Sequence, residues 1–264
     1  MTFWLLYLAV GLVAGLLAGL LGVGGGLVIV PVLVFIFTAQ HFPEAHLVHM
    51  ALGTSLASIM FTSVSSFRAH HSHGAVKWPI VRGLTPGIVA GTLLGSVLAA
   101  HLPTAFLKLF FVVFLFYVGT QMLLNIRPQA SQPLPGLAGL FAVGGAIGGI
   151  SSLVGIGGGT LSVPFMTWCN VKMHEAIGTS AAIGFPIAVA GGAGYVANGL
   201  AVNGLPPHSL GFVYLPALAG VVAASLMTAP VGARLAHRLP VGRLKKIFAF
   251  LLYVMGIKMA LGLL

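Results

Sequence analysis

The sequence predicts an all-α integral membrane protein built from two related halves. Its 264 residues are 58% hydrophobic and only 5% charged, and the mean hydropathy is +1.09. Soluble domains carry about 25% charged residues, so this chain has too few charges to cover a surface that faces water. A glycine-rich motif also occurs twice, each time inside a long apolar stretch. Composition therefore predicts a polytopic membrane protein, and the repeated motif predicts that a half-protein was duplicated.

The two glycine motifs are separated by a constant offset. The first reads Gly22-Val-Gly-Gly-Gly26 and is followed by Leu-Val-Ile-Val-Pro. The second reads Gly155-Ile-Gly-Gly-Gly159, 133 residues later, and is followed by Thr-Leu-Ser-Val-Pro. Since glycine disfavours the interior of a helix, both copies predict a helix that is broken near its middle.

A second motif pair extends the repeat. It reads His49-Met-Ala-Leu-Gly-Thr-Ser55 in the first half and His174-Glu-Ala-Ile-Gly-Thr-Ser180 in the second, with an offset of 125 residues. The segment between the halves is rich in proline and polar residues, which is typical of a loop. We therefore predict an N-terminal transmembrane repeat at 1–127, a linker at 128–136 and a C-terminal transmembrane repeat at 137–264.

The apolar segments fall into two kinds. A span needs about 20 apolar residues, and six segments fit this length: 46–66, 79–100, 104–126, 175–197, 210–232 and 243–264. Two longer stretches, 3–40 and 134–168, contain the glycine motifs. Each of these is either one kinked span or a helical hairpin that enters the membrane and returns to the same side.

The basic residues favour the hairpins. With kinked spans, the two sides of the membrane receive five and seven of the 12 Lys and Arg residues. With hairpins, ten lie on one side and only Lys108 and Lys258 on the other, as the positive-inside rule prefers. Both termini would then be non-cytoplasmic. Each half would hold a Gly-broken hairpin plus three transmembrane helices, and the halves would have inverted topology, which is typical of secondary transporters.

The glycine breaks are the candidate anion site. Consecutive glycines let a substrate approach the backbone, and the next half-helix begins with unpaired N–H groups at its positive dipole end. The Gly-Thr-Ser motifs add hydroxyl groups. The candidate substrate-binding residues are Gly24, Gly25, Gly26, Thr54, Ser55, Gly157, Gly158, Gly159, Thr160, Thr179 and Ser180. Two alternatives are that the glycines only allow close helix packing and that the hydroxyls bond to carbonyls of their own helix.

Three residues are candidates for coupling or gating. His49 and His174 recur at equivalent repeat positions, and a histidine titrates near physiological pH. Glu175 has Met50 at its equivalent position. A proton-coupling role predicts that Glu175→Gln alters the pH dependence of flux, and an unchanged pH dependence would discard that role.

Several other functions are disfavoured. Only two carboxylates are present, which argues against a cation pathway. The run His70-His71-Ser-His73 has no carboxylate or thiolate beside it, so a solvated loop is favoured over a metal site. The basic residues lie in short loops and at helix ends, which does not favour nucleic-acid binding. No catalytic or nucleotide-binding motif is present, and we expect no enzymatic activity, no cofactor and no bound metal.

The duplicated motifs resemble those of the sulfite exporter TauE/SafE family of membrane permeases. The resemblance rests on Gly-Val/Ile-Gly-Gly-Gly before Val-Pro and on Ala-Leu/Ile-Gly-Thr-Ser, each present twice, and it covers nearly the whole chain. It implies transport of small anions, sulfite or organosulfonates such as sulfoacetate among them, across the bacterial inner membrane. We expect alternating access around the two glycine breaks, and a homodimer is plausible. The rival functions are a divalent metal-ion transporter that uses the histidine run, an uncoupled anion channel and a non-transporting assembly factor.

Overall fold

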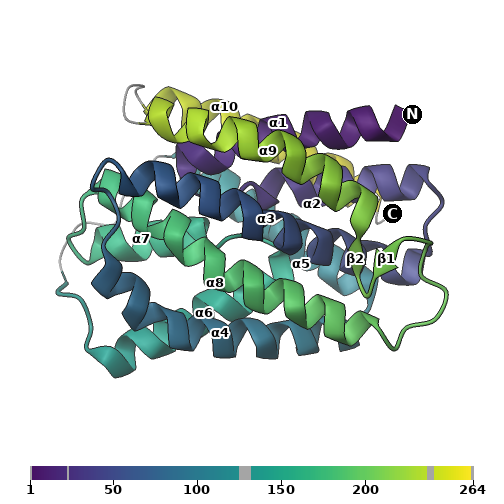
Figure 1. Cartoon of the computed structure of the whole chain (residues 1–264), viewed down its shortest axis with the longest axis horizontal. Coiled ribbons are helices and arrows are strands. Elements are labelled where there is room, and N and C mark those ends of the chain that lie inside the picture. The colour runs from purple at the N-terminus through teal and green to yellow at the C-terminus, as the bar shows by residue number, and fades with distance from the viewer. Residues whose placement is uncertain (1, 23, 125–131, 237–240, 263–264) are drawn as a thin grey trace.

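The chain forms a bundle of helices that run along the long axis of the molecule (Figure 1). The computed structural model describes residues 2–22, 24–124, 132–236 and 241–262. The helices are α1 (Thr2–Leu21), α2 (Gly26–Ala39), η1 (Glu44–His46), α3 (Leu47–His71), α4 (Trp78–His101), α5 (Thr104–Leu123), α6 (Leu137–Val154), α7 (Gly159–Trp168), α8 (Met173–Gly199), α9 (Leu215–Ala236) and α10 (Val241–Leu261). A short antiparallel hairpin precedes α9; its strands, β1 (Ser209–Leu210) and β2 (Val213–Tyr214), have two residues each.

The helical membrane architecture predicted from composition is confirmed. Within the described residues, seven helices are long and apolar enough to cross a membrane: α1, α3 together with η1, α4, α5, α6, α8 and α9. Helices α3 and α8 lie at the centre of the bundle, and most of their residues are buried. Phenylalanine and leucine side chains on α1, α4 and α5 remain exposed, as expected for surfaces that face lipid.

Both glycine motifs break a helix and turn the chain back. Helix α1 ends at Leu21 and α2 begins at Gly26, and Tyr7 near the start of α1 donates a hydrogen bond to Gln40 at the end of α2 (3.1 Å). In the second half, Asn170 after α7 lies 3.4 Å from the carbonyl of Gln132, which precedes α6. Each pair therefore returns to the end of the molecule from which it started. The structure has helical hairpins rather than kinked spans.

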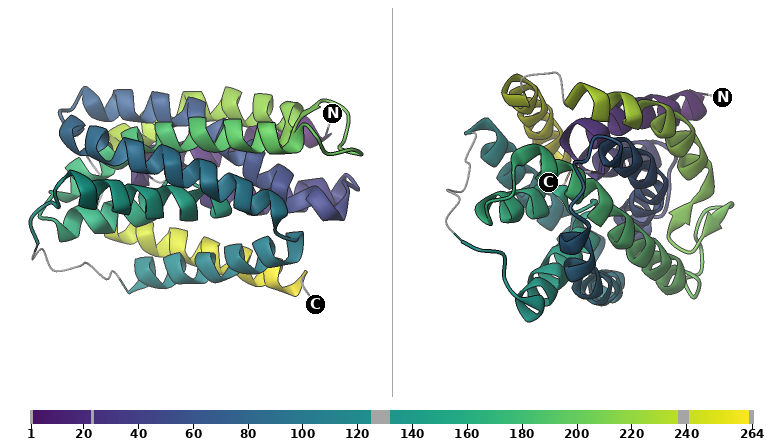
Figure 2. Two further views of the ribbon diagram at one scale, coloured as in Figure 1. Left: turned by 90° about the horizontal axis from the view of Figure 1, so that it is seen from below. Right: turned by 60° about the vertical axis from the view of Figure 1, so that its left-hand side comes forward.

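Helices of one half pack against helices of the other. Helix α1 packs along α9, and α6 packs along α4 (Figures 1 and 2). Glycines allow a close approach: a Cβ built on Gly11 would lie 2.4 Å from the Val221 carbonyl oxygen, and one on Gly144 would lie 2.4 Å from that of Leu84. The halves 1–127 and 137–264 are therefore interleaved. Most of the proposed linker, up to residue 131, lies outside the described residues.

Most of the described basic residues gather at one end of the bundle. Arg68 lies in the last turn of α3, Arg234 in the last turn of α9, and Lys77 and Lys172 directly precede α4 and α8. Lys108 and Lys258 lie at the other end. Lys108 donates a hydrogen bond to the Gly262 carbonyl, and the Lys258 ammonium lies 4.6 Å from the Phe35 ring centroid. Arg127 and Arg238 lie outside the described residues, as do the side chains of Arg243 and Lys245.

Helix α1 begins and α10 ends at this second end, with Lys108 and Lys258 (Figure 1 and the left view of Figure 2). In the second half, the β1–β2 hairpin lies between α8 and α9. At the equivalent place in the first half, a loop joins α3 to α4, and this loop lies at the opposite end of the molecule. The spatial separation of the charges follows from the two hairpins, because each hairpin leaves the direction of the next span unchanged.

Candidate functional site

The two glycine breaks touch each other inside the bundle. A Cβ built on Gly24 would lie 3.1 Å from Gly157 Cα, and one on Gly26 would lie 2.3 Å from the carbonyl oxygen of Gly155. Gly24 and Gly25 have φ values of +77° and +80°, in the left-handed region that residues with a Cβ atom rarely adopt. The structure therefore needs glycine here both for the turn and for the contact between halves.

The half-helices that follow the breaks begin without side-chain caps. The N-cap of α2 is Gly25 and that of α7 is Gly158, with φ values of +80° and +75°, and neither has a side chain that accepts a hydrogen bond. The first N–H groups of a helix have no partner within it, and they lie at the positive end of the helix dipole. One such start follows each of the two breaks, and the breaks contact each other through Gly24 with Gly157 and Gly26 with Gly155.

The serines of the Gly-Thr-Ser motifs fasten each half to the break of the other. Ser55 donates a hydrogen bond to the Gly155 carbonyl oxygen (2.7 Å), and Ser180 donates one to that of Gly22 (3.0 Å). Both serines are fully buried. The two bonds correspond to each other under the offsets of the sequence repeat, so the halves make matching contacts.

The threonines of the same motifs also bond across the halves. Thr54 accepts a hydrogen bond from the Tyr214 N–H, just before α9, and Thr179 accepts one from the Lys77 N–H, just before α4, both at 2.9 Å. None of the four hydroxyls, of Thr54, Ser55, Thr179 and Ser180, bonds to a carbonyl of its own helix. The alternative of local bonds within each helix is therefore not what the structure has. These four hydroxyls hold the ends of neighbouring spans against the central helices.

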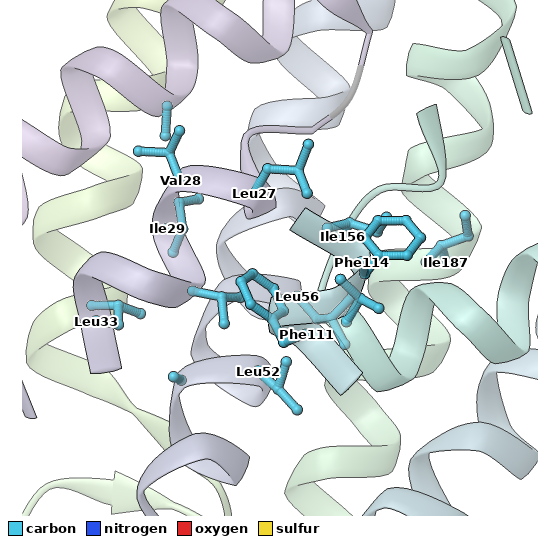
Figure 3. Close-up of a cluster of buried hydrophobic side chains, with 14 of the residues drawn as sticks. Leu27, Val28, Ile29, Leu33, Leu52, Leu56, Phe111, Phe114, Ile156 and Ile187 are labelled. Atoms are coloured by element: carbon cyan, nitrogen blue, oxygen red, sulfur yellow. The ribbon is translucent and has the colours of Figure 1, made fainter. Parts of the chain in front are cut away.

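Thr160 differs from the hydroxyl-bearing candidates of the Gly-Thr-Ser motifs, because its hydroxyl has no hydrogen-bond partner among the described residues. It lies in the first turn of α7 and is 4% exposed. Its neighbour Ser162 donates to Ser180 (2.8 Å). In the first half, the equivalent residues Leu27 and Ile29 are fully buried in the hydrophobic cluster of Figure 3. The two half-sites are therefore chemically different.

A small cavity lies beside the breaks. Its volume is about 10 Å³, and its lining comes from both halves: Ala18, Gly22, Gly24, Ser63, Ser66, Ala181 and Gly184. A space of that size holds at most about one water molecule. Sequence reasoning did not single out Ser63, Ser66 or Gly184, because none of them belongs to a duplicated motif.

The three coupling candidates lie away from the breaks and differ from one another. His49 is buried, and its Nε2 lies 3.0 Å from the Ala99 carbonyl oxygen and 3.1 Å from that of Leu102. His174 is exposed. Glu175 forms an ion pair with Lys77 (3.0 Å) at the end of the bundle where the basic residues gather. The equivalent sequence positions of the two histidines thus have different surroundings.

The Lys77–Glu175 ion pair connects the halves at the bundle end, and its contribution to stability is testable. The Lys77 and Glu175 side chains are 46% and 18% exposed, so solvent screens the pair and we expect Glu175→Gln to lower the free energy of unfolding by no more than about 1 kcal/mol. The loss should shrink in high salt. Thermal unfolding at two salt concentrations measures it. The charge-swapped double variant Lys77→Glu/Glu175→Lys should recover part of the loss, and no recovery would contradict a direct pairing.

The histidine run does not gather into one site. The His70 Nε2 lies 3.0 Å from the Gly19 carbonyl oxygen, the Trp78 indole donates to His71 (3.3 Å), and the His73 Nδ1 lies 2.8 Å from the Ala69 carbonyl oxygen. Within the ranges that the structure describes, no three His, Cys, Asp or Glu side chains come together as metal ligands would.

The chain is similar over almost its full length to proteins named as probable membrane transporters. It is 39% identical to one from Haemophilus influenzae, over 98% of this chain and 99% of that protein. It is 28% identical to YdhB of Bacillus subtilis (89% and 91%) and 26% identical to one from Methanocaldococcus jannaschii (97% and 95%). No solved structure matches the chain. Fold and relatives together define a multi-pass membrane transporter.

The family follows from a match to a family model. The model described as "Sulfite exporter TauE/SafE" matches residues 7–259, and the chain belongs to this family. The resemblance found in the duplicated motifs is thereby confirmed.

Proposed function

We propose that this transporter carries small anions, sulfite or organosulfonates such as sulfoacetate, through a site between the two glycine breaks. One observation carries the proposal: the glycine breaks contact each other in the protein interior, and the helices that follow them begin at Gly25 and Gly158 without side-chain caps. Their N–H groups provide a neutral set of donors for an oxyanion. The unpartnered Thr160 hydroxyl adds a further donor at the same place.

The proposed mechanism is alternating access. The halves have opposite orientations in this proposal, so each glycine break enters from its own side of the membrane and the substrate site lies where the breaks meet. The cavity of about 10 Å³ beside the breaks is smaller than any oxyanion, so the conformation described is closed around the site. Transport then requires the elements around the breaks to separate toward one side of the membrane at a time.

The membrane orientation is part of the same proposal. The end of the bundle that carries Arg68, Lys77, Lys172 and Arg234 is assigned to the cytoplasm by the positive-inside rule. Both termini are then non-cytoplasmic, in a bacterial inner membrane. A homodimer is the proposed assembly.

The test is flux into proteoliposomes that contain the purified protein. Radiolabelled sulfite and sulfoacetate are supplied in parallel with nickel and cobalt ions at two pH values, and protein-free liposomes are the control. We expect saturable uptake of at least one anion and no uptake of the metal ions. Metal uptake without anion uptake would contradict the proposal and return the histidine run to consideration. Saturation at carrier rates separates this function from an uncoupled channel.

A further inference from the structure

The matching contacts of the two halves give a residue-by-residue correspondence through the centre of the molecule. Ser55 and Ser180 both bond to the opposite glycine break, and their positions differ by 125 residues. The same offset relates the rest of α3 to α8. Residues of α3 that line the cavity can therefore be compared with the residues that take the same place in α8, and the reverse.

The residues of α8 that line the cavity differ in size from their equivalents on α3. Helix α8 contributes the small residues Ala181 and Gly184. Their equivalents on α3 are Leu56 and Ile59, which are both fully buried. Small residues leave the space open in one place, and branched side chains fill it in the other.

Leu56 packs over the equivalent of a cavity-lining residue, and Ile59 packs against the first glycine break. Leu56 Cδ1 would lie 2.8 Å from a Cβ on Gly191, and Ile59 Cγ2 would lie 3.1 Å from a Cβ on Gly24. Gly191 is the equivalent of Ser66. Leu56 also belongs to the buried hydrophobic cluster of Figure 3, with Ile156 and Phe111. At one position the protein thus has a hydroxyl beside a cavity, and at its equivalent a glycine covered by leucine.

Ser66 is a polar group without a partner. It is 2% exposed, and its Oγ has no hydrogen-bond partner among the described residues although it lines the cavity beside Gly22 and Gly24. A buried hydroxyl normally finds a partner, because leaving one unpaired is unfavourable. Ser63, one helical turn earlier, lines the same cavity and donates only to the Met60 carbonyl of its own helix (3.2 Å).

The cavity lies on the side of the breaks that faces the basic end of the bundle. Ser63 and Ser66 precede Arg68 on α3, and Ala181 and Gly184 follow Glu175 on α8. Between the cavity and that end lie the Lys77–Glu175 pair and the close contact of Gly178 with the Ala75 carbonyl, where a Cβ would come within 2.7 Å. On the other side of the breaks, Leu56 and Ile59 close the equivalent route.

We infer that Ser66 binds the anion as it moves between the glycine breaks and the basic end of the bundle, and that Leu56 and Ile59 form the barrier toward the opposite end. This inference rests on the proposed anion transport and adds a binding residue, a lining and a direction to it. On the side of the breaks that faces the basic end, the route between α3 and α8 is lined by Ser63, Ser66, Ala181 and Gly184. On the other side, the buried side chains of Leu56 and Ile59 must move before the route can open.

The first experiment compares two serine substitutions on the same helix. Ser66→Ala removes the unpartnered hydroxyl, and Ser58→Ala is the matched control, because Ser58 is equally buried and bonds only to the Thr54 carbonyl of its own helix (2.8 Å). We expect Ser66→Ala to raise the KM for the transported anion about 10-fold, as the loss of one hydrogen bond to a charged group predicts. Ser58→Ala should stay within about 2-fold of wild type. Equal KM values for all three proteins would overturn the role of Ser66.

The second experiment tests the direction and does not depend on the substrate. In a Cys169→Ser background, Ser66→Cys, Ser63→Cys and Ser58→Cys are treated with a charged thiol reagent, once in right-side-out and once in inside-out membrane vesicles. We expect Ser66→Cys and Ser63→Cys to react at least 10-fold faster from the side of the basic end, and Ser58→Cys to react from neither side. Faster labelling from the opposite side, or labelling no faster than that of Ser58→Cys, would overturn the inferred route.

The two experiments also separate this inference from the proposed function. If the wild-type protein moves none of the anions, the anion proposal fails, while the labelling pattern still decides whether the route exists. If the anion is transported and the labelling is reversed, only the inference fails. Sulfoacetate should slow the labelling of Ser66→Cys, and it is preferred to sulfite because sulfite itself consumes thiol reagents.

Discussion

Substitution of Gly25 by alanine is expected to abolish transport and to destabilise the protein. The residue has a φ of +80°, and a Cβ there would lie 2.7 Å from the carbonyl oxygen of Ala14 and 3.1 Å from its carbonyl carbon. The left-handed conformation costs about 1–2 kcal/mol for a residue other than glycine, and overpacking adds roughly 1–3 kcal/mol. Relief requires α1 to move away from the start of α2, because the clashing atoms belong to the backbone.

A second glycine isolates the effect of the contact from that of the backbone conformation. Gly204 has a φ of +81°, and a Cβ there meets nothing within 4 Å. Gly204→Ala therefore carries the same conformational strain without the clash, and we expect transport close to wild type with a loss of stability of about 1–2 kcal/mol. Thermal unfolding in one detergent and flux in one liposome preparation measure both variants. Similar losses in the two would show that close packing at the break is unimportant.

Removal of the serine hydroxyls that join the halves is expected to have the second largest effect. Ser55→Ala takes the donor away from the buried carbonyl of Gly155, and Ser180→Ala does the same at Gly22. A buried group that loses its partner costs about 1–3 kcal/mol. Ser180 also accepts a hydrogen bond from Ser162, so Ser180→Ala leaves two groups unpaired and should be the more harmful change.

Ser58→Ala serves as the control for these two substitutions. Its hydroxyl bonds to the Thr54 carbonyl four residues earlier on the same helix, a local bond that adds little to stability. Denaturant or thermal unfolding of the three variants gives the comparison, and the double variant Ser55→Ala/Ser180→Ala should lose more than either alone. The importance of the cross-half bonds would be refuted by three equal stabilities.

Much of the fold could be predicted from the sequence, because the membrane imposes few solutions. Apolar length located the spans, and glycine runs located the breaks at Gly22–Gly26 and Gly155–Gly159. The count of basic residues then chose hairpins over kinked spans, and the contact of Tyr7 with Gln40 shows the first hairpin directly. These inferences succeed because hydrophobic thickness and charge placement act on each segment separately.

The partners of the Gly-Thr-Ser motifs could not be predicted in the same way. The spacing placed Thr54 and Ser55 early in a span, but which carbonyl or N–H they meet depends on how the halves interleave. The structure shows Thr54 beside Tyr214 and Ser55 beside Gly155, more than 90 residues away in each case. Ser66 could not be predicted from the repeated motifs, because its equivalent position in the second half is Gly191. Repeated motifs identify only positions at which the two halves agree.

The packing of α1 against α9 has a consequence for the order of events during biosynthesis. The last residue of α1 is Leu21 and the first of α9 is Leu215, so 194 positions separate the two packing partners along the chain. At about 5–20 residues per second, the ribosome needs roughly 10–40 s to cover that distance. Throughout this interval, the face of α1 that carries Gly11, Gly15 and Gly19 has no helix to pack against. Helix α1 is thus made long before its packing is complete, and a nascent chain released before α9 emerges leaves α1 without its partner.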